Sequence, residues 1–269
     1  IVASLVGSEM CIRDSNLAID ITFDLVLKEE LLRAELISAP LTILILLFVF
    51  GTVVSASLPA LSGIYTVIAA VGIIHGLTYI VDDLTVYAVN IVSLLGIGLS
   101  VDYSLFIVNR FREELGRGHD KRTAIAMTSA TAGRAILFSG LTVIAGLTGM
   151  LFFENTGLPS LGWGGICATL VALTSSVILL PSILAILGDR INSGRVPLGL
   201  STEVADDGFW SDLAKRVMSK PLSFLVPSVL ILLVAGAPFL QAEWGITSWK
   251  ALSPDNEARS GMELTDENW

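Results

Sequence analysis

Charged residues are scarce in this chain of 269 residues. They account for 15% of it, whereas soluble domains carry about 25%, and hydrophobic residues account for 53%. Cysteine and histidine are scarcer still, with two of each, which predicts neither a disulfide framework nor a metal site. A glycine-rich phosphate loop of the Walker type is absent, and the histidines, His75 and His119, lie in different segments. The sequence therefore predicts no enzyme active site and no cofactor, and its composition excludes an ordinary soluble domain.

Long apolar runs dominate what is present. About 20 apolar residues are enough to span a bilayer as a helix. Pro40 is expected at the start of the first run, Pro59 in a tight turn after it, and Pro181 at a kink in the fifth. The sequence therefore predicts an all-α, polytopic helical membrane protein with six spanning helices, at about 40–57, 61–80, 86–108, 135–153, 158–187 and 221–241. Residues 39–188 form a five-helix bundle in this prediction.

Four polar stretches surround these runs. Residues 16–38 alternate leucines with charged residues at spacings that predict an amphipathic helix leading into the membrane. Residues 189–220 form a polar linker, in which apolar positions from Trp210 to Met218 predict a short surface helix. Residues 242–269 are polar again. Residues 1–15 have neither a basic start nor a long apolar centre; they resemble a translated, non-native linker and are excluded from fold reasoning.

The positive charges are unevenly distributed, although the net charge is −9. Most lysines and arginines lie in two loops, at 110–134 and 188–220, whereas the loops at 82–85 and 154–157 contain none. By the positive-inside rule, the basic loops are cytoplasmic, so the 189–220 linker is too, and the other two loops face outside. This clustering favours membrane orientation over a nucleic-acid partner.

Single residues in the first basic loop also have expected roles. Arg110, Arg112 and Arg134 are most simply interfacial anchors, and Asp120 is expected to cap a short interfacial helix.

One ionisable residue, Asp102, lies deep inside the third apolar run. Arg110 follows it eight residues later, which is about 12 Å along a helix at ~1.5 Å per residue. Placing a carboxylate at that depth costs about 2.5–3.5 kcal/mol on insertion scales, so it indicates a functional site by default. Tyr103 adds a hydroxyl that is able to donate to a carboxylate. The sequence predicts a proton relay at Asp102 and Tyr103; the alternative is a carboxylate that hydroxyl groups satisfy and that only packs helices.

Several residues near Asp102 and Tyr103 have alternative expected roles. Ser100 on the same run, and Ser139 and Thr142 on the next, are candidate neighbours of the relay; back-bonding to their own helices is the alternative for Ser139 and Thr142. Gly96 and Gly98 let another backbone approach closely, which predicts helix packing.

Two further residues lie in or beside apolar runs. His75 is either a polar contact in the bundle or a histidine at a helix end, and Cys167 is a small packing residue.

The stretch Gly98–Val108, Gly-Leu-Ser-Val-Asp-Tyr-Ser-Leu-Phe-Ile-Val, is followed by Arg110-Phe111-Arg112-Glu113-Glu114. It resembles the MMPL family of the RND transporter superfamily. Further similar stretches occur in the family's order, at 34–40, 133–143, 179–182 and 252–254, so the resemblance extends from about residue 16 onward.

The resemblance implies a specific architecture. Family members have two halves, each with six spanning helices and a large external porter domain. This chain then covers the second to seventh helices, with 16–38 as the end of the first porter domain and 242–269 as the start of the second. Asp102 and Tyr103 match the first of two Asp-Tyr pairs. The second pair belongs to the missing other half of the polypeptide, so this chain alone should not transport.

The function implied by the resemblance is secondary active transport, not enzymatic catalysis. It is export of lipids or other hydrophobic molecules across the cytoplasmic membrane, driven by protons; the oligomeric state, a homo-oligomer included, stays open. The alternative is a non-transporting lipid- or sterol-sensing module like the sterol-sensing domains of Patched-like proteins. Such a module needs no titrating carboxylate, so Asp102 with Tyr103 favours the exporter. Protein translocation by relatives of the same fold matches the motifs less well.

Overall fold

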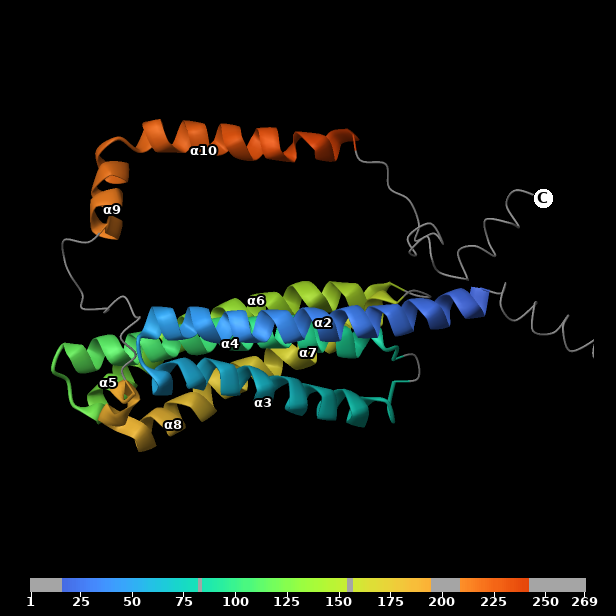
Figure 1. Ribbon diagram of the computed structural model, residues 1–269, viewed down its shortest axis with the longest axis horizontal. Coiled ribbons are helices and arrows are strands. Elements are labelled where there is room, and N and C mark those ends of the chain that lie inside the picture. Colours follow the sequence, from blue (N-terminus) through green and yellow to red (C-terminus); the bar gives the residue numbers. More distant parts are fainter. Residues whose placement is uncertain (1–15, 82–83, 154–156, 195–208, 242–269) are drawn as a thin grey trace, which may run out of the picture. The chain divides into compact units, whose positions relative to one another are not determined.

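The computed structural model describes residues 16–81, 84–153, 157–194 and 209–241 (Figure 1). Their secondary structure is helical, and the chain divides into two units, residues 31–202 and the segments 1–30 with 203–269. Within the described ranges, five helices are long and apolar enough to cross a membrane: Val53–Leu77, Tyr87–Gly116, Lys121–Phe152, Leu158–Asn192 and Pro221–Leu240. The chain is therefore an all-α, multi-pass membrane protein, as its apolar runs predicted.

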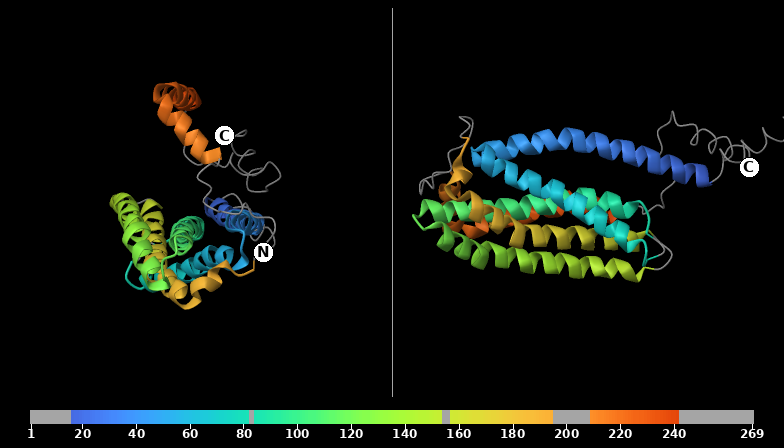
Figure 2. Two further views of the ribbon diagram at one scale, coloured as in Figure 1. Left: turned by 90° about the vertical axis from the view of Figure 1, so that its left-hand side faces the viewer. Right: turned by 90° about the horizontal axis from the view of Figure 1, so that it is seen from below.

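Helix α4 (Tyr87–Gly116) is the centre of the 31–202 unit. It packs along α3 (Val53–Leu77) on one side and α7 (Leu158–Thr174) on another, and α6 (Arg134–Thr148) lies against α7 (Figure 2). Small residues permit the closest of these approaches. A Cβ atom added at Gly164 of α7 would overlap the carbonyl oxygen of Ala88, so α7 meets the α4 backbone directly at that point.

Two of the spanning helices contain a π-helical turn. The first begins with α5 (Lys121–Thr128), continues through the π-turn η1 (Ser129–Gly133) into α6, and ends in the 3-10 turn η2 (Gly149–Phe152). The second runs from α7 through the π-turn η3 (Ser175–Leu179) into α8 (Leu180–Leu187) and the 3-10 turn η4 (Gly188–Asn192). Asp120 caps α5 as expected, because its carboxylate accepts the backbone N–H of Arg122 at 3.2 Å.

The junction between the first two helices differs from the sequence prediction. We expected Pro40 at a helix start and the turn at Pro59, but Pro40 lies inside α2 (Asn16–Phe50) and Pro59 lies inside α3. The chain turns instead at Gly51, whose φ of 65° is a left-handed conformation that glycine adopts without strain. Prolines are tolerated inside membrane helices because neighbouring groups satisfy the freed carbonyl oxygens.

The apolar part of α2, Leu36–Phe50, is shorter than the other candidate spans. In the other unit, α9 (Phe209–Ser219) is a short helix in the part of the linker where the pattern predicted one, and its place at the membrane surface stays a prediction. It is followed by α10 (Pro221–Gly236) and the 3-10 turn η5 (Ala237–Gln241). The predictions for 1–15, for 242–269 and for most of the 189–208 segment lie outside the described residues.

The two basic segments of the bundle lie at the same end. Arg112 Nε of α4 donates to Asn192 Oδ1 at 3.0 Å, and the Lys121 side chain lies beside Gly188. At the opposite end, the Thr85 backbone N–H donates to Ser160 Oγ at 3.1 Å. This arrangement agrees with the alternation of basic and non-basic loops, while the side of the membrane that each end faces stays a prediction.

Candidate functional site

Asp102 lies in the middle of α4, on the face that turns away from α3 and α7. Residues four apart share a helix face, and Gly98, Asp102 and Phe106 are all exposed, continuing toward Asn109. Within the part of the chain that the structure describes, no side chain covers the Asp102 carboxylate enough to bury it. An exposed carboxylate at mid-helix of a spanning segment would face lipid or another polypeptide segment, and lipid alone is costly for it.

Tyr103 lies on a different face of α4, which points into the bundle. A helix turns by 100° per residue, so the ring of Tyr103 enters the core and is only 6% exposed. Its hydroxyl is buried, and it has no hydrogen-bond partner among the described residues. The two members of the predicted relay are therefore adjacent in sequence but are not hydrogen-bonded to each other in this conformation.

The two candidate neighbours on α6 are exposed. Thr142 Oγ1 donates to the Phe138 carbonyl oxygen at 2.9 Å, which is the back-bonded alternative, and Ser139 lies exposed on the same helix. Among the described residues, neither side chain is hydrogen-bonded to Asp102. Ser139 and Thr142 thus form an exposed polar stripe on α6, and the Asp102 carboxylate is exposed as well.

Ser100 is the candidate neighbour that the structure encloses. It is fully buried, and its hydroxyl bonds to Ser62 at 2.8 Å and to Thr66 at 2.9 Å, both on α3. Sequence reasoning considered Ser100 only as a neighbour of Asp102. Its partners lie 38 and 34 residues away in the chain, and no local pattern predicts that pairing.

The two glycines of α4 have different surroundings. A Cβ atom at Gly96 would meet Ala168 of α7 and Thr66 of α3, each at 3.5 Å, so Gly96 lies in the contact between three helices. A Cβ atom at Gly98 would meet nothing within 4 Å. Gly98 instead belongs to the open face, one turn before Asp102.

His75 lies near the end of α3 and is exposed. Its ring packs edge-on against Tyr79, with ring centroids 5.8 Å apart. That position fits the helix-end alternative. No group of three or more histidine, cysteine, aspartate or glutamate side chains capable of holding a metal ion occurs in the described ranges.

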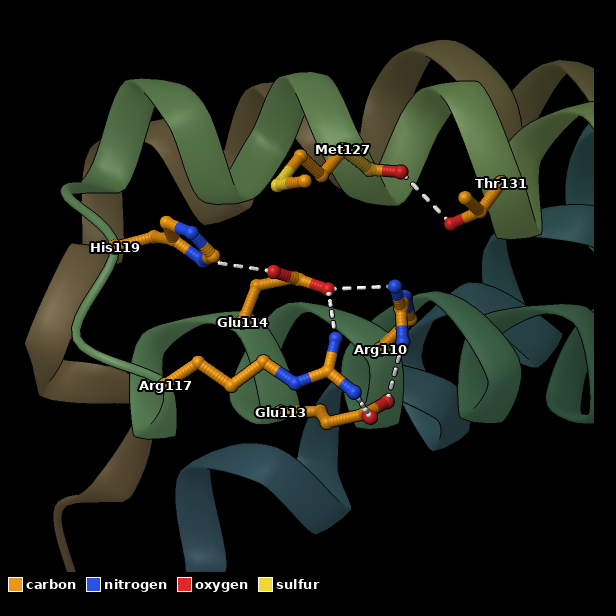
Figure 3. Close-up of polar contacts among 7 residues, drawn as sticks. All are labelled: Arg110, Glu113, Glu114, Arg117, His119, Met127 and Thr131. Carbon is orange, nitrogen blue, oxygen red and sulfur yellow. Dashed lines mark hydrogen bonds and ion pairs between the residues drawn. The ribbon is translucent and has the colours of Figure 1, made fainter.

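A buried ion-pair cluster, which the sequence analysis missed, lies at the basic end of α4 (Figure 3). The Glu114 side chain is completely enclosed. Its Oε1 lies 2.6 Å from Arg110 Nη2 and 2.8 Å from Arg117 Nη1, and its Oε2 lies 2.8 Å from His119 Nδ1. Glu113, which is 35% exposed, pairs with the same two arginines. The i,i+3 and i,i+4 spacings of these residues are the signal that would have found the cluster.

Arg112 is also more than the interfacial anchor that we expected. Its Nη1 donates to the Phe50 carbonyl oxygen at 2.9 Å, and its guanidinium lies 5.7 Å from the centre of the Phe50 ring. That carbonyl is one of those left unpaired where α2 ends. The arginine therefore caps α2 and ties the α2–α3 turn to α4.

The chain has clear relatives. The sequence model described as the MMPL family matches residues 18–224. The trehalose monomycolate exporter MmpL3 of Mycobacterium tuberculosis (strain ATCC 25618 / H37Rv) is 34% identical over 260 residues, covering 87% of this chain and 27% of that protein. The mycolic acid-containing lipids exporter MmpL11 of Mycolicibacterium smegmatis (strain ATCC 700084 / mc(2)155) is 35% identical over 237 residues, covering 87% of this chain and 25% of that protein.

A third relative comes from another genus. The putative membrane protein SCO6666 of Streptomyces coelicolor (strain ATCC BAA-471 / A3(2) / M145) is 34% identical over 232 residues, covering 86% of this chain and 32% of that protein. The chain thus spans about a quarter to a third of the length of these curated relatives. Because the family model matches residues 18–224, which include α4 and its mid-helix carboxylate, the chain belongs to the MMPL family.

Proposed function

We propose that this chain is part of a proton-driven exporter of lipids or other hydrophobic molecules across the cytoplasmic membrane. The observation that carries the proposal is Asp102, an ionisable group at mid-helix of a spanning segment on a face that the described bundle leaves open. Two relatives are named as lipid exporters, which supports a lipid as the transported molecule. The proposal makes the protein a secondary active transporter that uses an ion gradient and carries out no catalytic step.

In this proposal Asp102 takes up a proton on one side of the membrane and releases it to the other. The open face of α4 receives a second half of the transporter, which supplies the matching Asp-Tyr pair. Tyr103 acts as a hydrogen-bond donor to the relay, and this requires α4 or the side chain to turn, because its hydroxyl is enclosed here. Ser139 and Thr142 on the outward stripe of α6 are the proposed neighbours of the relay.

The energy that one proton supplies limits the mechanism. Moving one charge through ~150 mV supplies about 3.5 kcal/mol, at ~2.3 kcal/mol per 100 mV. Removing an acyl chain of about 16 carbons from lipid into water costs roughly 12 kcal/mol, at ~0.8 kcal/mol per CH₂. One proton per lipid is therefore too little unless the chain stays out of water. The exporter needs an apolar path, several protons, or both.

The test is export from proteoliposomes that contain the full-length polypeptide carrying this chain, with an imposed pH gradient and trehalose monomycolate as the probe lipid. Asp102→Asn keeps the shape and hydrogen-bonding capacity of the side chain but removes its proton, so gradient-dependent export should be lost. Tyr103→Phe should weaken export less, since it removes a hydrogen bond worth roughly 0.5–1.5 kcal/mol and leaves the carboxylate in place.

Asp189→Asn is the matched control, because Asp189 is an exposed carboxylate in η4 and not at mid-helix. It should export at the wild-type rate at equal protein incorporation. If Asp102→Asn also exports at that rate, the proton-carrier role is wrong. The non-transporting lipid-sensing module then becomes the better reading of the same helices.

A further inference from the structure

Four buried hydroxyl groups join three helices at the level of Asp102. Ser62 Oγ of α3 lies 2.8 Å from Ser100 Oγ of α4 and 2.9 Å from Ser175 Oγ, the first residue of the π-turn η3. Thr66 Oγ1, one turn along α3, donates to Ser100 Oγ at 2.9 Å. None of these four side chains is more than 7% exposed. Ser62 takes part in two of the three bonds and joins Ser100 to Ser175; we call this set the hydroxyl chain.

The hydroxyl chain has a donor to spare. Four hydroxyl groups carry four hydrogens, and three hydrogen bonds use three of them. Thr66 donates to Ser100, while either atom of the Ser62–Ser100 and Ser62–Ser175 bonds is able to donate. The free hydrogen therefore rests on Ser175, on Ser100 or on Ser62, depending on which groups donate. All three arrangements keep the three interhelical bonds, so the links between the helices persist.

The position of Ser100 on α4 links the hydroxyl chain to the orientation of Asp102. Ser100 and Asp102 are two residues apart, which is about 200° around a helix, so they point to nearly opposite sides. Fixing Ser100 against α3 therefore turns Asp102 outward. At the far end, Ser175 begins a π-turn, a helix irregularity that is frequent at functional sites.

We propose that Ser62 is a positioning residue: through its bonds to Ser100 and Ser175 it sets the rotation of α4, and so the orientation of Asp102. The inference deepens the proposed function, because a relay carboxylate must face its partner. The rotation of α4 itself does not depend on proton transport. A measurement of rotation can therefore fail or succeed independently of any export assay.

The experiment reads the rotation of α4 in the complete chain reconstituted in phosphatidylcholine vesicles. In a background with Cys11→Ser and Cys167→Ala, a spin label is attached to Phe106→Cys, on the open face, or to Leu105→Cys, which is partly buried. Molecular oxygen dissolves in the acyl region, so its collision rate with each label reports exposure to lipid. The label at 106 should be clearly more accessible than the label at 105 in the otherwise unchanged chain.

Ser62→Ala should abolish this contrast, so that both labels become similarly accessible, and Ser62→Thr should restore it because a hydroxyl returns. Thr66→Val should reduce the contrast only partly, since the Ser62 bonds remain. Ser57→Ala is the matched control: Ser57 also lies on α3, but it bonds to its own helix at the Val54 carbonyl oxygen. An unchanged contrast in Ser62→Ala would overturn the proposal. If that variant does not fold, Ser100→Ala removes the Ser62–Ser100 bond from the α4 side, and an unchanged contrast there would overturn the proposal equally.

Discussion

The Glu114 carboxylate is fully enclosed where α4 reaches the basic end of the bundle, and Arg110, Arg117 and His119 surround it. Removing one partner of a buried ion pair leaves the other charges uncompensated. Glu114→Gln should therefore lower the free energy of unfolding by about 3 kcal/mol, the low end for such a change, because Arg117 is half-exposed and able to rehydrate. The thermal midpoint of the purified protein in detergent measures the loss.

Glu113→Gln is the matched control for that prediction. Glu113 pairs with the same two arginines, but its side chain is 35% exposed, and exposed pairs contribute about 0–1 kcal/mol. Its thermal midpoint should stay close to that of the unchanged protein. Equal losses in the two variants would mean that burial of the Glu114 carboxylate does not decide the energetics of this cluster.

Asp120, the N-cap of α5, provides a prediction about pH. A hydrogen bond from the Thr123 side chain, with smaller help from backbone N–H groups, holds the pKa of the Asp120 carboxyl below its ordinary value of 3.8. A carboxyl whose pKa is lower in the folded protein stabilises the fold above its ordinary value, and this stability is lost as the pH falls through the lowered value. Hydrogen-exchange protection of residues 121–128 should therefore fall as the pH is lowered from about 5 to below 3.8, after correction for intrinsic rates.

The Asp120→Asn variant removes the titrating charge of residue 120 and keeps its ability to cap the helix. Asparagine still caps a helix, so α5 should form, but its protection should lose the dependence on pH that the carboxylate confers. Asp120→Ala should fray α5 at every pH. The same pH dependence in Asp120→Asn as in the unchanged protein would assign it to another group.

Among whole elements, the α4–α7 pair depends on a direct backbone approach at Gly164. A methyl group there would overlap the Ala88 carbonyl oxygen and the Ile91 side chain, and the backbone atom cannot rotate away. Gly164→Ala should therefore separate the two helices and cost about 1–3 kcal/mol, the usual range for overpacking. The thermal midpoint and the yield of folded protein should both fall.

Gly72→Ala in α3 is the control for this packing prediction, because a Cβ atom at Gly72 meets nothing within 4 Å. It should leave the thermal midpoint unchanged or raise it slightly, since alanine is a better helix former than glycine. A loss as large as that of Gly164→Ala would mean that glycine content, and not the contact with Ala88, sets the stability.

At the scale of the whole molecule, the sequence predicts the spanning helices because length and hydropathy decide them. It does not predict the α2–α3 turn correctly, since the carbonyl of Phe50 is capped by Arg112, which lies 62 residues away. Asp102 and Tyr103 stand out by residue type and depth. The exposure of Asp102 and the burial of Tyr103 do not, because they depend on how α4 packs against helices that lie far away in the chain.

The last prediction concerns the orientation of the bundle in the membrane. The uneven distribution of lysine and arginine predicts that the 110–134 and 188–220 segments are cytoplasmic and that the 82–85 and 154–157 loops face outside. In a background with Cys11→Ser and Cys167→Ala, an impermeant thiol reagent should label Asn155→Cys in intact cells. It should label Lys121→Cys only after the membrane is opened, and labelling of Lys121→Cys in intact cells would contradict the topology. Because Arg112 holds Asn192 at the same end of the bundle as Lys121, one label at that end locates both α5 and η4.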